Sequence, residues 1–474
     1  MTRTTIDRVS TGAHRLDRIL GGGLTRNSIN LVIGMPGSGK TILAEQCVYG
    51  NAEPERPALY FTTVSEPLDK VLRFGQTLSF FDPLAVGARV RYEDLGTVLG
   101  DRGLAGVLDR LRQAIQEDRP GMIVIDSFKA LRAYATGDGP FRQFLHVLTG
   151  MLTAVPVTSI WVGEYGRGEI ADAPEFAVAD TILAMGTSRS GERSTRRLQV
   201  LKLRGGEFLS GEHAYRISAD GITAYPRLAD PASVTRHAVG EQRRSSGVPA
   251  LDDMLDEGYR PGTSTLVAGP TGVGKTLMGL HFVFHGARHG EPGVLATLQE
   301  NPTQLERVVR GFGWSLADDR VTLMYRTPVD LYVDEWVYDL LDTINATGAT
   351  RVLVDSLADL QSAAPDPVRF REYVYSLLHR CARMGVSVMM TYEMAELTGT
   401  TRLTEYGASH LADNVVLLQY QGFDTTTVSR TLTVLKTRAS SHDPRVREYR
   451  ITPDGITLSG RPTGLRPGVP VTSG

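Results

Sequence analysis

The sequence is poor in cysteine and has no long apolar run. Its 474 residues include two cysteines, Cys47 and Cys381, without metal-ligand spacing. We interpret both as small buried residues of a protein in a reducing compartment. No apolar run approaches the roughly 18 residues of a membrane span, and the first ten residues lack the apolar core of a signal peptide. We therefore expect a soluble, cytoplasmic protein without a membrane partner.

The sequence also lacks an excess of charge of either sign. Lys and Arg number 51, Asp and Glu number 53, and the formal net charge is −2. Such a balance produces no general attraction to nucleic acid or to anionic lipid. We therefore expect no nucleic-acid partner.

An internal repeat dominates the sequence. GMPGSGKT at residues 34–41 returns as GPTGVGKT at residues 269–276, and MIVIDS, RRLQVLKLRG and YRISADGITAYP return in the same order as RVLVDS, RTLTVLKTRA and YRITPDGITLSG. A period this long indicates a duplicated domain rather than a solenoid. We predict domains at 1–228 and 244–459, a linker at 229–243, and a disordered Pro/Gly-rich tail at 460–474.

Each half alternates short apolar runs with helical segments. The runs INLVIG, ALYFTTV, GMIVID, SIWVGE and DTILAM are continuous, which is typical of strands covered on both faces. RRLQVLKLRG and RTLTVLKTRA alternate instead, as expected for antiparallel edge strands. The sequence predicts tandem α/β domains, each with a twisted, mostly parallel central sheet flanked by helices.

The two glycine-rich octapeptides fit the phosphate-binding loop pattern, each between a strand and a helix. Their glycines let backbone N–H groups converge on phosphate oxygens, the lysine reaches the β and γ phosphates, and the threonine binds Mg²⁺. The alternative, a glycine-rich turn with an exposed lysine, requires the same coincidence twice. The expected ATP-binding residues are Gly37, Ser38, Gly39, Lys40, Thr41 and Ile42, and Gly272, Val273, Gly274, Lys275, Thr276 and Leu277.

An aspartate ends an apolar strand in each half, Asp126 in the first and Asp355 in the second. A carboxylate at this place can hold Mg²⁺, usually through water. An Asp-Ser pair before a helix can also be a helix cap. We favour the metal role, shared with Thr41 and Thr276, because both halves repeat it.

These motifs resemble the KaiC family, the double-domain branch of the RecA-like ATPases. The resemblance covers about residues 5–455 in the family's order and includes STGAHRLDRILGGGL, SSGVPALDDMLDEGY, EFAVADTIL, SHLADNVVLLQY, LKLRG and LKTRASSHD. It implies two RecA-like P-loop NTPase domains and a ring of identical subunits, usually a hexamer. It also implies ATP between neighbouring subunits, and we expect a protein output partner that the sequence does not identify.

In that family a Lys-x-Arg pair reaches across the interface to a neighbour's ATP. Residues two apart on a strand point to one face, so the pair acts together. A solvated basic face is the alternative. The resemblance assigns this role to Lys202, Leu203 and Arg204, and to Lys436, Thr437 and Arg438, with Arg196, Arg430, Ser440 and His442 also contacting nucleotide.

The family usually carries Glu-Glu where a carboxylate activates the attacking water. This chain has Ser65-Glu66 and Gln299-Glu300 instead. Glutamine cannot accept the proton of the attacking water but can orient that water. A general base typically raises the reaction rate by about 10²–10⁴-fold, so its loss slows hydrolysis without abolishing it. We therefore expect slow hydrolysis that uses Glu66, Glu300 and Gln299, with Lys40 and Lys275 on the phosphates.

Clock proteins of the family phosphorylate a Ser-Thr pair, which aligns here with Ser409-His410, and a nearby family threonine aligns with Thr404. Weak autokinase activity at Ser409 is one hypothesis, and an unmodified interface serine is the other. The tail is shorter than the family's regulatory extension, from which we expect a signalling or stress regulator outside the clock. A RecA- or RadA-like DNA-dependent ATPase and a non-catalytic ATP-gated scaffold are the rival functions.

Overall fold

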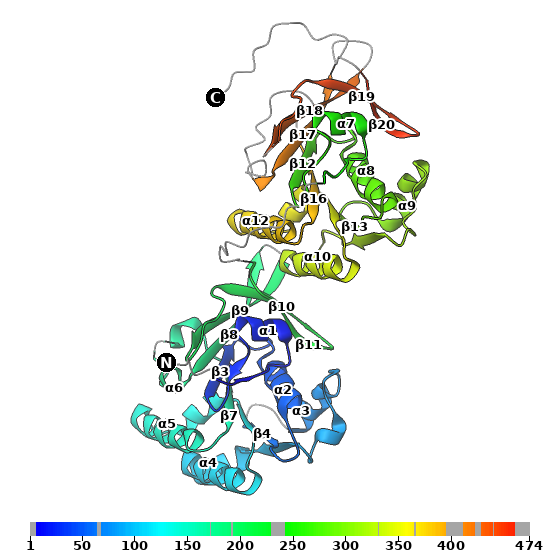
Figure 1. Cartoon of the computed structure of the whole chain (residues 1–474). Coiled ribbons are helices and arrows are strands. Elements are labelled where there is room, and N and C mark those ends of the chain that lie inside the picture. The colour runs from blue at the N-terminus through cyan, green and yellow to red at the C-terminus, as the bar shows by residue number, and fades with distance from the viewer. Residues whose placement is uncertain are drawn as a thin grey trace, which may run out of the picture. The chain divides into compact units, whose positions relative to one another are not determined.

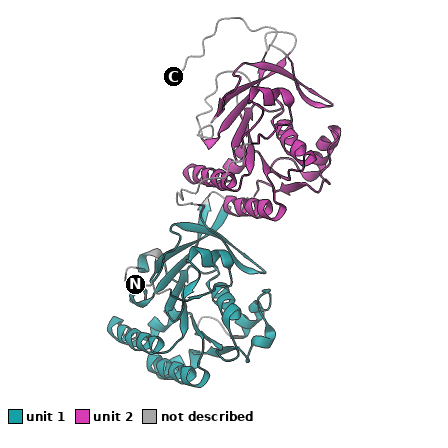
Figure 2. Cartoon of the chain, in the orientation of Figure 1, with its two compact units in different colours: residues 1–227 teal, residues 228–474 magenta. Residues whose placement is uncertain are grey.

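The structure, a computed structural model, divides into two compact units, residues 1–227 and 228–474 (Figure 2). We describe each unit by itself. The predicted tail and nearly all of the predicted linker lie outside the described residues. The described residues are 6–63, 68–170, 172–190, 193–228, 242–329, 331–364, 366–394, 411–421, 428–438 and 440–459.

The first unit is built on a nine-stranded sheet (Figure 1). Neighbouring strands are parallel along the series β8, β3, β7, β6, β4 and β5. They are antiparallel along the series β8, β9, β10 and β11. In spatial order they are β11 (Gly221–Tyr225), β10 (Glu212–Ser218), β9 (Arg193–Leu203), β8 (Thr181–Ser190), β3 (Ile29–Gly34), β7 (Thr158–Gly163), β6 (Met122–Asp126), β4 (Ala58–Thr62) and β5 (Val90–Asp94), and β1 (Arg8–Val9) pairs separately with β2 (Leu24–Thr25).

Helices cover both faces of this sheet. Along β3, Leu31 and Ile33 pack in one core and Val32 packs in the other, because successive side chains of a strand point to opposite faces. The first core contains α4 and α5, and the second contains α1 and α2 (Figure 1). Burying each such aliphatic side chain contributes roughly 1.5–3 kcal/mol, which explains the unbroken apolar runs. The helices are α1 (His14–Ile19), α2 (Lys40–Asn51), α3 (Leu68–Gly75), α4 (Gly96–Asp118), α5 (Asp138–Thr153) and α6 (Glu175–Val178).

The second unit repeats the plan. In its nine-stranded sheet, neighbouring strands are parallel along the series β14, β13, β15, β16, β12 and β17. They are antiparallel along the series β17, β18, β19 and β20. The spatial order is β14 (Val321–Tyr325), β13 (Gly293–Thr297), β15 (Arg351–Asp355), β16 (Ser387–Glu393), β12 (Ser264–Gly269), β17 (Asn414–Gln421), β18 (Ser429–Thr437), β19 (Arg447–Thr452) and β20 (Gly455–Leu458). The helices are α7 (Pro249–Met254), α8 (Lys275–Arg288), α9 (Pro302–Gly311), α10 (Val333–Thr347), α11 (Leu357–Ser362) and α12 (Pro367–Arg383).

The predicted fold class is confirmed, with one correction. β9 and β18 are antiparallel, as their alternating pattern predicts, but neither is an edge strand. A hairpin follows each of them, β10–β11 and β19–β20, and extends the sheet by two more strands. The two cysteines are buried, and none of the described helices is long and apolar enough to cross a membrane.

Candidate active site

Each phosphate loop joins the central strand of its sheet to a helix. In the first unit the loop leaves β3, and α2 begins at Lys40. Gly37 and Gly39 have φ of 75° and 88°, a left-handed backbone that side chains rarely adopt. Gly272 and Gly274 repeat this geometry with φ of 74° and 107°. Each loop therefore turns its backbone at the glycine before the lysine, which the phosphate-binding pattern requires, and at a further glycine two residues earlier.

The loop lysines lie over their own loops. Lys40 Nζ donates to the carbonyl of Met35 at 3.0 Å, and Lys275 Nζ donates to that of Pro270 at 2.9 Å. Burial lowers the pKa of both lysines, and the nearby carboxylates Glu164 and Asp126 oppose that shift at Lys40. A buried cation with a lowered pKa is stabilised by an incoming anion, because the anion's charge replaces lost hydration.

The threonine after each lysine bonds to the predicted metal-side aspartate. Thr41 Oγ1 lies 2.8 Å from Asp126 Oδ2, and Thr276 Oγ1 lies 2.9 Å from Asp355 Oδ2. A hydroxyl and a carboxylate side by side are oxygen donors of the kind that Mg²⁺ prefers. In addition, the buried Ser38 Oγ in the loop has no hydrogen-bond partner among the described residues. The donor set thus fits a nucleotide with a divalent cation.

Each aspartate has a further donor, and the two donors come from different strands. Tyr60 on β4 donates to Asp126 Oδ2 at 2.9 Å. Thr391 on β16 donates to Asp355 Oδ1. Burial raises the pKa of Asp355, while Thr391, Thr276 and then the charge of Lys275 oppose the shift.

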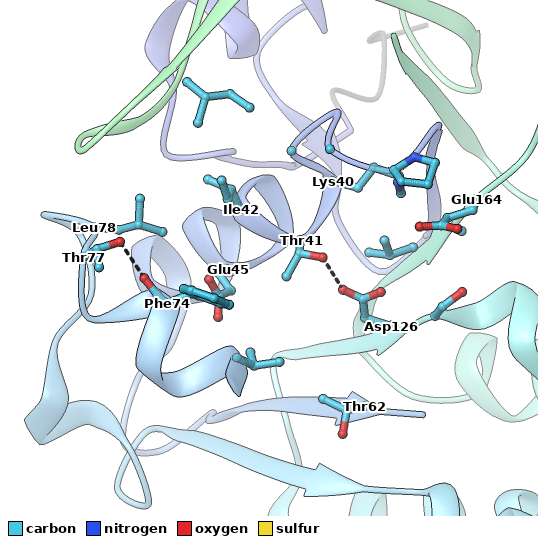
Figure 3. A pocket seen from close by; sticks show the side chains of 18 of the residues that line it. Lys40, Thr41, Ile42, Glu45, Thr62, Phe74, Thr77, Leu78, Asp126 and Glu164 are labelled. Carbon is cyan, nitrogen blue, oxygen red and sulfur yellow. Dashed lines mark hydrogen bonds between the residues drawn. The ribbon is translucent and has the colours of Figure 1, made fainter. Parts of the chain in front are cut away.

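A cavity of about 750 Å³ runs along the loop of the first unit (Figure 3). Lys40, Thr41 and Asp126 lie at one part of it, together with Glu164. The other part is formed by α2, α3 and β10. The cavity is therefore lined at one end by side chains of the phosphate-binding motif and at the other end by both apolar and polar side chains.

The expected water-activating acids are only partly described. Ser65 and Glu66 lie outside the described residues. Burial raises the pKa of Glu300, with the charge of Asp355 as a second cause, and its buried Oε2 has no hydrogen-bond partner among the described residues. Gln299 Nε2 lies 3.4 Å from Ser356 Oγ, which places the amide beside the residue that follows Asp355.

A carboxylate that the sequence interpretation missed stands in each site. Glu164 lines the first cavity, and Glu393 ends β16 in the second unit and accepts from Thr271 of the phosphate loop. Their charges raise the pKa values of Lys40 and Lys275, against the larger effect of burial. The signal was available, because SIWVGE and SVMMTYE both end an apolar run in glutamate.

The predicted intersubunit cations fall into two groups. Arg196 lies beside its own loop, where Nη1 donates to the carbonyl of Gly37 at 2.6 Å. Lys202 and Arg204 lie at the other end of β9, near the start of β3, since Lys202 pairs with Ile182 and Ile182 with Leu31. Strand geometry puts Arg204 roughly 26 Å along β9 from Arg196. Lys202 and Arg204 are thus remote from their own loop.

The second unit repeats this division. Arg430 pairs with Tyr420 at the loop end of β17, and Lys436 pairs with Val415 at the far end. Lys202 donates to the carbonyls of Phe176 and Ala177 at 3.2 and 3.1 Å, and Lys436 donates to that of Ala412 at 2.7 Å. Burial, then the neighbouring arginine, lowers the pKa of both lysines.

The remaining predicted residues lie around these cations. Arg204 and Arg438 approach Asp180 and Asp413 at 3.5 and 3.6 Å. Leu203 packs against the first unit's core. Thr437 Oγ1 lies 2.7 Å from the carbonyl of Ser440 and 3.1 Å from His442 Nδ1, which joins these three residues in one cluster. Thr404, Ser409 and His410 lie outside the described residues.

Comparison with known proteins gives a match along nearly the whole chain. A family model for the KaiC ATPase matches residues 9–229 and again residues 244–462. The chain is 28% identical to the circadian clock oscillator protein KaiC of Rippkaea orientalis, over 96% of this chain and 89% of that protein. It is also 28% identical to the circadian clock protein KaiC3 of Synechocystis, over 98% of this chain and 95% of that protein.

Proposed function

The chain belongs to the KaiC family of ATPases, and we propose that it hydrolyses Mg²⁺-bound ATP slowly at interfaces between the subunits of a ring. Both halves would bind ATP. Lys40 and Lys275 would contact the phosphates, and the Thr41–Asp126 and Thr276–Asp355 pairs would hold the magnesium ion. The bound ion would neutralise charge on the β and γ phosphates.

The position of Lys202 and Arg204 carries this proposal. Their side chains lie a strand's length from the phosphate loop of their own subunit. A cation stabilises the transferred phosphoryl group only where it touches it. If these residues act on ATP, they therefore act on a neighbour's ATP, and closed repetition of such a head-to-tail contact produces a ring. A hexamer is the ring size that we propose.

Slow turnover follows from the residues in front of Glu66 and Glu300. Gln299 can orient a water molecule but cannot take its proton, so Glu300 is left as the base of the second half. Its raised pKa favours proton uptake. Glu66 has the same proposed role in the first half, and any autokinase activity at Ser409 or Thr404 would be weak for the same reason.

The relatives named above are clock proteins. We propose for this chain a regulatory role outside the clock, in which occupancy of the ring by ATP controls an output partner. An ATP-gated scaffold without turnover is the alternative that the missing first acid of each pair favours.

A phosphate-release assay on the purified full chain tests the proposal. We expect slow, Mg²⁺-dependent turnover that is lost in a Lys40→Ala, Lys275→Ala double variant. Native mass measurement with and without ATP gives the ring size. Turnover no higher than that of the double variant, together with an ATP-dependent ring, would leave the scaffold as the function.

A further inference from the structure

A carboxylate follows the strand between the phosphate loop and the metal-side aspartate in each half. In the first half, β7 lies between β3, which leads into the loop, and β6, which ends at Asp126. Glu164 comes directly after β7 and lines the same cavity as Lys40 and Asp126 (Figure 3). In the second half Glu393 ends β16 and pairs with Gly269, the first residue of the loop. Both carboxylates therefore stand where the loop and the aspartate meet.

The charges around each loop lysine show which carboxylate acts on it most strongly. Burial lowers the pKa of Lys40, and the charge of Glu164 opposes this shift more strongly than that of Asp126. Burial also lowers the pKa of Lys275, and Glu393 is the stronger of the opposing charges there. The loop lysine binds the β and γ phosphates, and the water that attacks ATP enters in line with the γ phosphorus. Both glutamates are exposed, which leaves them accessible to such a water.

The third residue of the loop distinguishes the two carboxylates. Thr271 donates a hydrogen bond from its hydroxyl to Glu393 Oε1. This contact uses one acceptor position of the carboxylate and directs it towards the loop. Pro36 occupies the same place in the first loop, lines the cavity with Glu164 and has no hydroxyl to donate. The loop thus restrains the carboxylate of the second half by a contact that it cannot make in the first.

We propose that Glu164 orients the water that attacks ATP in the first half, whereas Thr271 prevents Glu393 from doing so in the second. The inference rests on the proposed function and leaves the base of each half as named there. One O–H of the water donates to Glu164, and the other gives its proton to the base. The water oxygen bonds to the γ phosphorus as the bond from that phosphorus to the leaving oxygen of ADP breaks, so the products are ADP and phosphate.

The two residues have different roles in this reaction. Glu164 touches the attacking water and is a catalytic residue, whereas Thr271 acts through Glu393 and is a positioning residue. The first half then sets the rate of ATP turnover, and the second half retains its ATP for longer.

Nucleotide binding tests the place of Glu164 without turnover. A full chain with Lys275→Ala reports the first half, and the ligands are ADP and an ATP analogue with a non-hydrolysable imido bridge. Glu164→Gln removes a negative charge beside the γ phosphate, so we expect the analogue to bind about fivefold more tightly and ADP to bind as before. Equal changes for the two ligands, or no change for either, would place Glu164 away from the γ phosphate and overturn the inference.

Exchange of the third loop residue tests the restraint. A full chain with Lys40→Ala reports the second half. There Thr271→Val removes the hydroxyl, and we expect kcat to rise about tenfold, the effect of one hydrogen bond, with little change in KM. Thr271→Ser keeps the hydroxyl and should raise kcat much less. In the Lys275→Ala chain, Pro36→Thr supplies the donor and should lower kcat about tenfold. Each kcat is expressed per bound nucleotide, which removes its dependence on the folded fraction.

A double variant separates the restraint from a loosened loop. Thr271→Val should not raise kcat in a chain that also carries Glu393→Ala, because the released carboxylate is then absent. A rise that persists without Glu393, or no rise while Glu393 is present, would contradict the inference. Phosphate release from both halves no faster than that of the Lys40→Ala, Lys275→Ala double variant would instead contradict the proposed function, and the binding measurement would still report the place of Glu164.

Discussion

The two halves hold the same aspartate in two different ways. Asp126 accepts a hydrogen bond from the Tyr60 hydroxyl of β4, and Asp355 accepts one from the Thr391 hydroxyl of β16. Where one half has the donor, the other has an apolar residue: Leu295 stands at the place of Tyr60, and Val162 at the place of Thr391. The duplication thus preserved a hydrogen-bonded carboxylate beside the loop threonine, while the side chain that supports it changed.

The two halves also differ in the side chain that joins the phosphate-loop helix to the last hairpin of the sheet. Gln46 accepts from the backbone N–H of Ile222 at 2.8 Å, and His281, at the same place in α8, accepts from that of Ile456 at 3.1 Å. Each bond ties the phosphate-loop helix to the hairpin that ends its sheet. Burial lowers the pKa of His281 to about 4, so the ring stays neutral and able to accept near neutral pH. The glycines, the lysine and the threonine of the phosphate loop are the same in both halves, but the residues that support them are not.

The largest expected effect distinguishes contacts within a subunit from contacts between subunits. Arg204→Ala, in a Lys275→Ala background, should lower first-half turnover by about 10³-fold if the arginine stabilises the transferred phosphoryl group. Arg438→Ala in a Lys40→Ala background should do the same to the second half. The measurement is steady-state phosphate release.

Mixing supplies the control. Arg204→Ala subunits have an intact Lys40, and Lys40→Ala subunits have an intact Arg204, both with Lys275→Ala. Mixed rings should recover part of the activity because intact residues meet at some interfaces. No recovery on mixing would contradict an arginine supplied by a neighbour.

The next effect concerns the missing acid. Gln299→Glu restores a carboxylate in front of Glu300, and we expect second-half turnover to rise by about 10²-fold, within the usual contribution of a general base. Gln299→Ala is the matched control and should not raise it. A rate that Gln299→Glu leaves unchanged would show that another step limits turnover.

A pH profile then tests Glu300 as the remaining base. Its pKa is raised, so the carboxyl takes up a proton at higher pH than an ordinary glutamate. Second-half turnover should therefore fall about tenfold per pH unit below that raised pKa and be level above it. The folded state holds this proton more tightly than the unfolded chain, so stability from this group is greatest at low pH and decreases as pH rises through the raised pKa. Glu300→Gln should abolish both pH dependences.

The smallest effect compares the two supporting donors. Tyr60→Phe and Thr391→Val each remove one hydrogen bond to an aspartate, at a cost of about 1–3 kcal/mol in the free energy of unfolding of that unit. Thr391→Val should cost more, because Asp355 is 2% exposed whereas Asp126 is only half-buried, while Tyr60 and Thr391 are both fully buried. Urea denaturation measures both, and Thr391→Ser, which keeps the hydroxyl, should be milder. Equal costs would mean that burial of the aspartate does not matter.

Local patterns predicted much of this protein. The glycine spacing predicted both loops, and continuous apolar runs predicted parallel strands covered on both faces, which Leu31 and Val32 confirm. The interpretation of β9 and β18 as edge strands was wrong, because an alternating pattern reports a partly exposed face and not the number of strands beyond it. The hairpin sequences were noticed only as part of the repeat.

Several site residues could not be read from local patterns. Tyr60 looks like an ordinary member of a strand, and its importance comes from a hydrogen bond across the sheet. Glu164 and Glu393 carried a signal at the ends of apolar runs, but only the order of strands puts those ends beside the loop lysines.

The sequence by itself determined the duplication, the phosphate loops and the α/β class, because these depend on residues close together in the chain. Tertiary structure decided that Lys202 and Arg204 lie at the opposite end of the sheet from their own loop, whereas Arg196 lies beside it. It also decided which side chain supports each aspartate. Strand order and register set these positions, and they join residues from 36 to 159 positions apart through packing that no local pattern encodes.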